Sequence, residues 1–227
     1  MGQDLSTLDR RTSADDVFDW LHEQINSLKL LPGTRISEIE VARRFDLSRQ
    51  PVREAFIRLA NRELVLIRPQ KATIVRRFSY EKIVRARFVR LSIECEVLRR
   101  ACNSISEQSS DRLSKSLEKQ SKAIDQGDID RFHNLDYEFH RQLCAAANSE
   151  FVFETIAEYK AQVDRLCMLS LSQPATMQEL LTDHEELVDA VKRQDTDKVT
   201  KVIHAHLCRL DDVIAGIRKS HADYFED

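Results

Sequence analysis

The stretch DLSRQPVREAFIRLANRELV, residues 46–65, has the pattern of a helix that follows a tight turn. Its apolar residues recur at i, i+3, i+4 and i+7, a spacing that predicts a single buried stripe. These residues are Val52, Ala55, Phe56 and Leu59. Ser48 can cap the first amide groups, and Pro51 falls in the first turn, where a missing N–H costs little. The pattern therefore predicts a helix with one packed side and one side facing solvent.

The solvent-facing side of this helix carries cations near its beginning. Arg49 and Arg53 lie one turn apart, so both can reach phosphates or guanine edges if this end enters a major groove. Gln50, next to Arg49, can pair with adenine. The same pattern also fits a surface helix with solvated arginines, which is the commoner use of a charged helix. The flanking sequence has to decide between the two interpretations.

Length and composition limit the class of protein. The chain has 227 residues, enough for one or two domains with a buried core. Hydrophobic residues make up 42% of it, and only four Gly and four Pro are present, which argues for a helical globular protein and against disorder or a large sheet. The net charge of −3 hides an asymmetry, because residues 35–77 hold 11 Lys and Arg against five Asp and Glu. That net of +6 leaves −9 for the rest, and such a basic block favours a polyanionic partner.

Cysteine usage and the N-terminus indicate the compartment. The five cysteines are odd in number and form no Cys-x-x-Cys pair, which is typical of reduced thiols in a cytoplasmic protein. The first 16 residues lack the apolar core of a signal peptide, and no apolar run approaches membrane-spanning length. The sequence therefore predicts a cytoplasmic protein with no membrane partner.

The segments before residues 46–65 complete a helix-turn-helix. Residues 1–12 are polar and expected to be flexible. Helices are predicted over about 13–28 and 37–45, the second with Ile39, Ala42 and Phe45 on its buried side. Asp46 tolerates the left-handed backbone that a tight turn requires. Two short helices joined in this way form a helix-turn-helix in which the second helix reads DNA.

Two short β-branched runs follow the reading helix. Residues 64–68 and 73–77 are separated by Pro-Gln-Lys-Ala, and this pattern predicts a β-hairpin that serves as a wing. Arg68 and Lys71 lie near its tip, where they could touch the DNA backbone or the minor groove. Each of them fits a solvated hairpin tip equally well.

These residues, in this order, closely resemble the winged helix of GntR-type bacterial transcription regulators. The resemblance covers residues 13–77 and includes a Pro-Gly turn and the reader motif Ser-Arg-x-Pro-Val-Arg-Glu-Ala. It implies that the operator contacts come from the start of the reading helix and from the wing. The implied residues are Ser48, Arg49, Gln50, Arg53, Arg68 and Lys71.

The chain departs from the family pattern at three positions. Ile39 stands where the family often has an arginine, so no base contact is expected from it. Glu63 and Ala72 replace the glycines that usually lie before the wing and at its tip. The family pattern therefore does not predict the conformation of the wing tip.

Residues 78–227 are predicted to form a second, all-helical domain, with Ser79 capping its first helix. Short polar breaks separate six helical segments, and short connections predict an antiparallel bundle of six or seven helices. The six segments lie near 80–104, 109–126, 129–147, 150–171, 176–193 and 196–220. The expected fold is thus mainly α, a winged helix-turn-helix followed by a helical bundle.

Four polar residues share the apolar stripes of this bundle. Asp136 and His140 lie one turn apart on one helix, and His184 and His206 lie on two later helices. Burial of unpaired polar groups is costly, so these positions require an explanation. Three imidazoles and a carboxylate suit Zn²⁺, with Ni²⁺ or Mn²⁺ as alternatives. A single histidine on such a stripe is more often a satisfied core residue, so the pattern alone leaves both readings open.

Residues 80–220 are similar to the ligand-binding domain of the FCD branch of the same family. The branch pattern, Asp-x3-His followed by two later histidines, falls on the four residues named above, which the resemblance implies as metal ligands. A further feature, an arginine four residues before a glutamate, falls on Arg90 and Glu94. By resemblance Arg90 faces a pocket and holds a carboxylate effector through its planar fork. A salt bridge from Arg90 to Glu94, one turn on, is the alternative.

Together these features predict a transcription regulator, a repressor, and not an enzyme. A small organic acid or sugar acid would control its binding to double-stranded operator DNA, and homodimerisation follows from the resemblance and from operator symmetry. Two alternatives remain: a metal-sensing regulator, in which the ion is the signal, and a metal-dependent hydrolase. The hydrolase leaves the winged helix unexplained.

Overall fold

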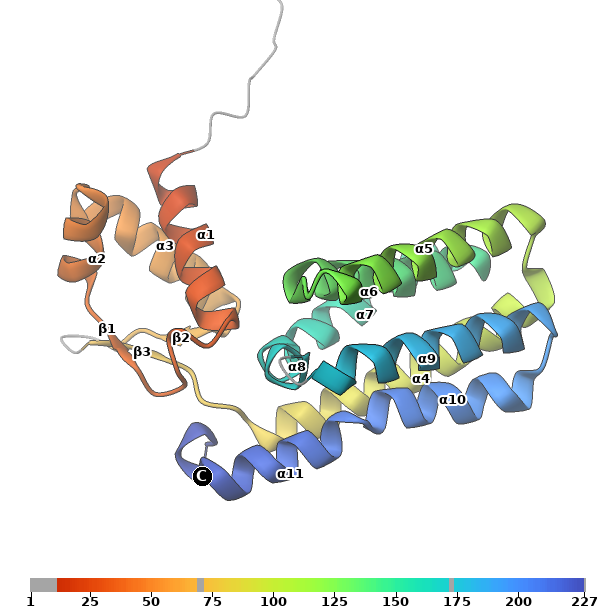
Figure 1. The fold of residues 1–227 in the computed structure, drawn as a ribbon. Coiled ribbons are helices and arrows are strands. Elements are labelled where there is room, and N and C mark those ends of the chain that lie inside the picture. Colours follow the sequence, from red (N-terminus) through yellow and green to blue (C-terminus); the bar gives the residue numbers. More distant parts are fainter. Residues whose placement is uncertain (1–11, 69–71, 172–173, 227) are drawn as a thin grey trace, which may run out of the picture. The chain divides into compact units, whose positions relative to one another are not determined.

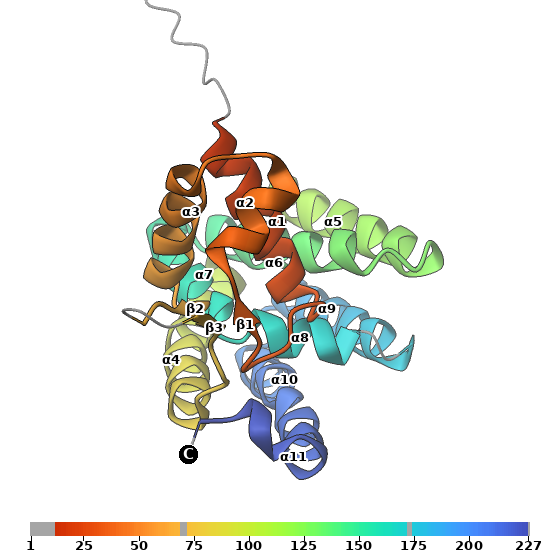
Figure 2. The same cartoon turned by 90° about the vertical axis from the view of Figure 1, so that its left-hand side faces the viewer.

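A computed structural model describes residues 12–68, 72–171 and 174–226 (Figure 1). The chain forms two compact units, one containing residues up to Phe78 together with 223–226, the other residues 79–222. The described part is mostly helical, with one small sheet in the first unit (Figure 2). The predicted fold class, a winged helix-turn-helix followed by a helical bundle, is confirmed. Of the segment expected to be flexible, only Thr12 lies within the described residues.

Three helices build the described first unit: α1 (Ser13–Asn26), α2 (Glu38–Phe45) and α3 (Arg49–Asn61). Asp46 ends α2 with φ 52° and ψ 46°, the left-handed turn that was predicted. This turn places the apolar stripe of α3 in the core with residues from α1 and α2. The whole predicted stripe of α3, from Val52 to Leu59, is buried. The helix-turn-helix thus follows from one turn residue and one apolar face.

The short helix α2 buries Ala42 and packs Phe45 against the core, as predicted, but not Ile39. Val41 and Ala42 are buried, whereas Ile39 is 53% exposed. Ile39 lies two residues before Val41, roughly 200° away around the helix, so both cannot face the core. The prediction for Ile39 was therefore wrong.

The wing is a three-stranded antiparallel sheet in the order β1-β3-β2. The predicted hairpin consists of β2 (Val65–Leu66) and β3 (Thr73–Val75), with Val65 opposite Val75. A third strand, β1 (Arg35–Ile36), pairs with the other edge of β3 and was not predicted, because two residues carry no alternation pattern. The tip at residues 69–71, which includes Lys71, lies outside the described residues.

The C-terminal end returns to the first unit. After the short helix η2 (Ala222–Tyr224), Phe225 forms a bridge with Phe78. The Phe78 amide donates to the Tyr224 carbonyl at 2.8 Å, and the Glu226 amide donates to the Phe78 carbonyl at 2.8 Å. The two aromatic rings also contact each other, with centroids 5.5 Å apart. This pairing was not predicted from the sequence.

The second unit is a bundle in which α5 and α6 lie side by side, as do α4 and α10 (Figure 1). Helix α9 packs against both α5 and α10 and so connects the two pairs. The described helices are α4 (Tyr80–Ser104), α5 (Glu107–Asp125), α6 (Ile129–Ala146), η1 (Glu150–Val152), α7 (Phe153–Ala161), α8 (Asp164–Leu171), α9 (Pro174–Lys192), α10 (Thr196–Cys208) and α11 (Leu210–Ser220). Ser79 caps α4 through the Lys82 amide, as predicted.

Two helices predicted as continuous are interrupted. The segment 150–171 divides into η1, α7 and α8, and the Val163 amide donates to the Lys160 carbonyl at 2.9 Å, a three-residue spacing. The segment 196–220 breaks at Arg209, whose amide donates to His206 with the same spacing. In both places the hydrophobic period continues, so the sequence alone does not show the break. Both breaks lie beside residues that pair with the polar centre described below.

The five cysteines, all within the described residues, are free thiols. Across the part of the chain that the structure describes, none of the helices combines the length and the apolar character needed to span a membrane.

Candidate metal centre and nucleic-acid interface

The outward side of α3 presents the residues predicted to read DNA. Arg49, Gln50 and Arg53 are all exposed. Ser48 stands at the N-cap and is exposed, but its side chain makes no capping hydrogen bond, contrary to prediction. The first turn also holds no acidic residue. The start of α3 thus combines two arginines with the positive end of a helix dipole, an arrangement that favours an anion.

A carboxylate on α2 links the two arginines. Glu38 Oε2 accepts from Arg49 Nη2 at 2.8 Å and from Arg53 Nη2 at 3.4 Å. Partial burial works to raise the pKa of the Glu38 carboxyl, but the hydrogen bonds from both guanidinium groups outweigh it and lower that pKa. Sequence reasoning missed this residue, since α2 and α3 become neighbours only through the turn at Asp46.

The wing supplies one further residue within the described part. Arg68 follows β2 and is half-buried. Lys71 falls outside the described residues, so the structure places only one of the two predicted wing cations.

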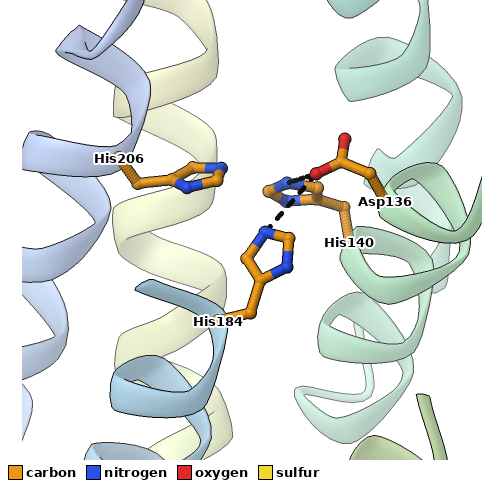
Figure 3. A group of neighbouring side chains, drawn as sticks. All are labelled: Asp136, His140, His184 and His206. Carbon is orange, nitrogen blue, oxygen red and sulfur yellow. Dashed lines mark ion pairs between the residues drawn. The ribbon is translucent and has the colours of Figure 1, made fainter. Parts of the chain in front are cut away.

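The predicted metal ligands come together from three helices of the second unit (Figure 3). Asp136 and His140 project from α6, His184 from α9 and His206 from α10. All four are buried, and one donor atom from each lies within 4.8 Å of the others. Residues separated by up to 70 positions therefore form one compact centre.

Asp136 directs one oxygen towards the histidines. Its Oδ1 lies 3.4 Å from His184 Nε2 and 3.9 Å from His140 Nε2, the two pairs marked in Figure 3. The ring of Phe139 stacks on His184, with centroids 4.1 Å apart. Packing thus holds at least one imidazole in a fixed plane.

The outer nitrogen of each imidazole faces an oxygen. Nδ1 of His184 lies 2.7 Å from Gln120 Oε1, and Nδ1 of His140 lies 2.6 Å from Glu94 Oε2. Nδ1 of His206 lies 3.4 Å from Asp183 Oδ2. Amide and carboxylate oxygens accept hydrogen bonds, so the contacts of His184 and His206 favour the tautomer with the proton on Nδ1 and the lone pair on Nε2. Partners of this kind orient histidine ligands in metal sites.

The centre fits a divalent transition metal. His140 Nε2 and His184 Nε2 are buried and have no hydrogen-bond partner among the described residues. A buried polar atom without a partner costs about 1–3 kcal/mol, so such atoms require an explanation. A metal ion would bind these lone pairs, and the set of three imidazoles and a carboxylate suits Zn²⁺.

Electrostatics keep the centre in a metal-binding form. Burial lowers the pKa of His184 far below its ordinary value, helped by the neighbouring imidazoles, and burial also lowers the pKa of His206. Burial alone would raise the pKa of Asp136, but the Lys160 ammonium and the histidines hold it well below the ordinary value. At neutral pH the site therefore offers neutral imidazoles from α9 and α10 and an ionised carboxylate.

Arg90 is buried and makes the salt bridge that was the alternative interpretation. Its Nε donates to Glu94 Oε1 at 2.8 Å, while Glu94 Oε2 faces His140. Burial would raise the pKa of Glu94, but Arg90 and His140 bring it to about 2. Arg90 also lines a cavity of about 20 Å³ between α4, the end of α10 and the start of α11, with room for about one water molecule.

A buried lysine beside the centre was also missed. Lys160 Nζ, on α7, lies 3.1 Å from Asp136 Oδ2 and 3.5 Å from Asp164 Oδ1. Burial works to lower the pKa of Lys160, but the two carboxylates reverse this and raise it. The available signal was the spacing of Ile156 and Lys160, which lie one turn apart on an apolar stripe. Gln120, the partner of His184, was missed in the same way, since it occupies a buried stripe position on α5.

Comparison with known proteins identifies the family. The chain matches the model of bacterial regulatory proteins of the gntR family over residues 13–75 and that of the FCD domain over residues 86–209. The chain belongs to the GntR family of transcriptional regulators. This GntR regulator is 36% identical over 211 residues to the HTH-type transcriptional repressor RspR of Escherichia coli K12, covering 93% of this chain and 92% of that protein. It is 26% identical to the gluconate operon transcriptional repressor of Bacillus subtilis, covering 82% and 78%.

Solved structures share the fold of this GntR regulator. E. coli McbR/YncC aligns with a TM-score of 0.67 at 21% identity, covering 93% of this chain and 99% of that one. A GntR regulator from Rhodococcus sp. RHA1 aligns with a TM-score of 0.70 at 21% identity, covering 89% and 97%. As a member of this family, the chain is a DNA-binding transcription regulator.

Proposed function

We propose that this GntR regulator represses transcription as a homodimer on operator DNA, and that a small carboxylate controls it through a divalent metal ion in the second unit. One observation carries the proposal. The donor atoms of Asp136, His140, His184 and His206 lie within 4.8 Å of one another, and two buried Nε2 atoms there have no hydrogen-bond partner among the described residues. The repressor names of relatives support the direction of regulation.

The four residues would hold Zn²⁺, with Ni²⁺ and Mn²⁺ as alternatives. The bound ion would supply a Lewis-acidic position that attracts a carboxylate oxygen. The protein would contribute the orientation of the imidazoles, because Gln120, Glu94 and Asp183 face their outer nitrogens. The site is thus suited to bind and orient an anion.

The balance of buried charge favours a monoanion. If only carboxylate, guanidinium and ammonium groups are counted, three anions and two cations that are ion-paired around the centre sum to −1, and a divalent ion changes the sum to +1. These residues are Glu94, Asp136 and Asp164, with Arg90 and Lys160. Asp183 and Arg209 form a further pair that leaves this sum unchanged. Because buried net charge is costly, one carboxylate on the metal would restore neutrality.

Arg90 is the proposed second contact for the effector. A guanidinium binds a carboxylate through two parallel hydrogen bonds. The cavity beside Arg90 holds about 20 Å³, so an organic acid would have to move the surrounding side chains. One relative is named for the gluconate operon, and gluconate is a sugar acid. We therefore propose an organic acid or sugar acid as the effector class.

The same proposal assigns the exposed start of α3 to operator reading. Arg49, Gln50 and Arg53 would contact base edges, with Ser48 and the wing cations on the backbone. A homodimer on an inverted repeat would place two such helices in successive major grooves. The effector would act by binding two arrangements of the protein with different affinity.

Gel shift against the region upstream of its own gene tests the reader assignment. Arg49→Ala with Arg53→Ala is expected to weaken operator binding by at least about thirtyfold, because each base contact contributes about 1–3 kcal/mol. Arg193→Ala, which removes an exposed arginine from the turn after α9, is the control and should bind as wild type. Tight binding by the double variant would refute the assignment.

Metal analysis of the purified protein and a thermal-shift screen of organic acids test the second unit. The wild type is expected to contain about one transition metal per chain and to be stabilised by at least one acid. His184→Ala should lose both properties. A wild type that neither contains nor binds metal would end the proposal for this centre.

A further inference from the structure

The buried lysine on α7 enters the function proposed above only through its charge. Lys160 is 3% exposed, and lysine is almost never fully buried unless it is paired. Its ammonium contacts Asp136 and Asp164 and lies 4.1 Å from the centroid of the Tyr137 ring. Tyr137 in turn donates to Asp164 at 2.7 Å. The lysine is therefore held firmly in place.

Lys160 shares a carboxylate with the proposed metal. The two oxygens of Asp136 face opposite partners: Oδ1 faces the imidazoles, and Oδ2 lies 3.1 Å from Lys160 Nζ. A carboxylate delocalises a single negative charge over both oxygens. A cation held at one oxygen thus opposes the approach of a second cation to the other, and inside a protein this repulsion is weakly screened.

We propose that Lys160 is an internal cation that competes with the metal ion for the charge of Asp136, so that the metal-free site stays assembled and the bound ion stays exchangeable. The inference rests on the metal site of the proposed function. Without metal, Lys160 compensates a carboxylate that would otherwise be buried and unpaired, which is strongly destabilising. With metal bound, the two cations repel, and linkage requires that each weaken the effect of the other.

A purely orienting role for Lys160 makes the opposite prediction. If the lysine only aimed Asp136 at the metal, its removal would weaken binding about 10–100-fold, the usual effect of losing a partner of a metal ligand. Competition predicts tighter binding together with a less stable metal-free protein. The sign of the change in metal affinity therefore separates the two roles.

The experiment measures Zn²⁺ affinity by competition with a chromogenic chelator, together with thermal unfolding of the metal-free protein. Lys160→Gln, which is neutral, is expected to bind Zn²⁺ about tenfold more tightly than wild type and to unfold at a lower temperature without metal. Lys160→Arg keeps the charge and should stay within about threefold of wild type in affinity. Lys201→Gln, at an exposed position on α10, is the control and should change neither quantity.

The outcomes separate this inference from the function on which it rests. If wild type binds Zn²⁺ and Lys160→Gln binds it equally or more weakly, competition is wrong and the metal site stands. If wild type does not bind Zn²⁺, the metal site itself is wrong. If Lys160→Gln is unfolded without metal, Zn²⁺ is expected to restore its folding, and failure to do so overturns the inference.

Discussion

Asp183 accepts hydrogen bonds from both Nε and Nη2 of Arg209, at 2.5 and 2.6 Å, and Arg209 is the residue between α10 and α11. Asp183 Oδ2 also faces His206 Nδ1. Burial works to raise the pKa of Asp183, but the hydrogen bonds from Arg209 and His206 bring it to about 2. One guanidinium thus fixes both a helix junction and the carboxylate behind a proposed ligand.

Arg209→Gln is therefore expected to weaken Zn²⁺ binding. Without the guanidinium, Asp183 can turn away from His206, and loss of such a partner typically costs at least about tenfold in metal affinity. Chelator competition measures the change. Arg193→Gln is the control, because its exposed guanidinium lies in the turn after α9 and pairs with Asp189, four residues earlier. Equal affinities for Arg209→Gln and wild type would show that Asp183 does not depend on Arg209.

Gln120→Leu is expected to destabilise the second unit by about 1–3 kcal/mol. The variant leaves the buried His184 Nδ1 without its acceptor, and an unsatisfied buried donor has this cost. Urea unfolding of the metal-free protein measures the loss. Gln178→Leu, at an exposed position on α9, is the control. A stability equal to wild type would mean that this hydrogen bond contributes nothing to folding.

Glu38→Gln is expected to reduce the discrimination between operator and random DNA. The neutral amide releases two guanidinium groups, which can then bind phosphates of any sequence. Fluorescence anisotropy should show tighter binding to random duplex and a salt slope steeper by about 1. Glu40→Gln, at an exposed position on the same helix, serves as the comparison. An identical change for operator and random duplex would contradict this role.

Asp15→Asn is expected to remove an acid-sensitive contribution to the stability of the first unit. The Thr12 amide and hydroxyl donate to Asp15 Oδ2, Arg58 donates to Oδ1, and these bonds lower the pKa of Asp15 from 3.8 to about 2. A lowered pKa stabilises the fold above the ordinary value, and this effect is lost as pH falls from about 4 to 2. Urea midpoints of wild type and variant should therefore differ at pH 6 and converge near pH 2. A constant difference across this range would exclude Asp15 as its source.

Removal of metal by a chelator is expected to abolish the response to the organic acid while operator binding persists. The reason is that the ion would hold the effector, whereas the reading residues lie in the other unit. Gel shifts with and without acid, before and after chelation, measure both properties. An unchanged response to the acid would show that the ion is not part of the effector site. If operator binding instead changes with the presence of the ion when no acid is added, the protein is a metal sensor.

Local periodicity was sufficient to predict most of the helices. It also predicted the pairing of Asp136 with His140, because residues one turn apart on a helix project from the same face. It could not show the breaks near Val163 and Arg209. Those breaks accompany contacts of Lys160 with Asp136 and of Arg209 with Asp183, which join distant parts of the chain. The partners Glu38 and Gln120 were missed for the same reason. Periodicity indicates which face is buried, but not which residues meet there.

Helix α3 begins without a side-chain cap and without an acidic residue in its first turn. In the free protein its leading amides thus depend on water, and such a helix end frays readily. An operator phosphate placed there would accept hydrogen bonds from these amides, so the DNA itself would cap the helix that reads it. Slower amide exchange at Arg49 and Gln50 in the complex than in the free protein would be the signature of this completion.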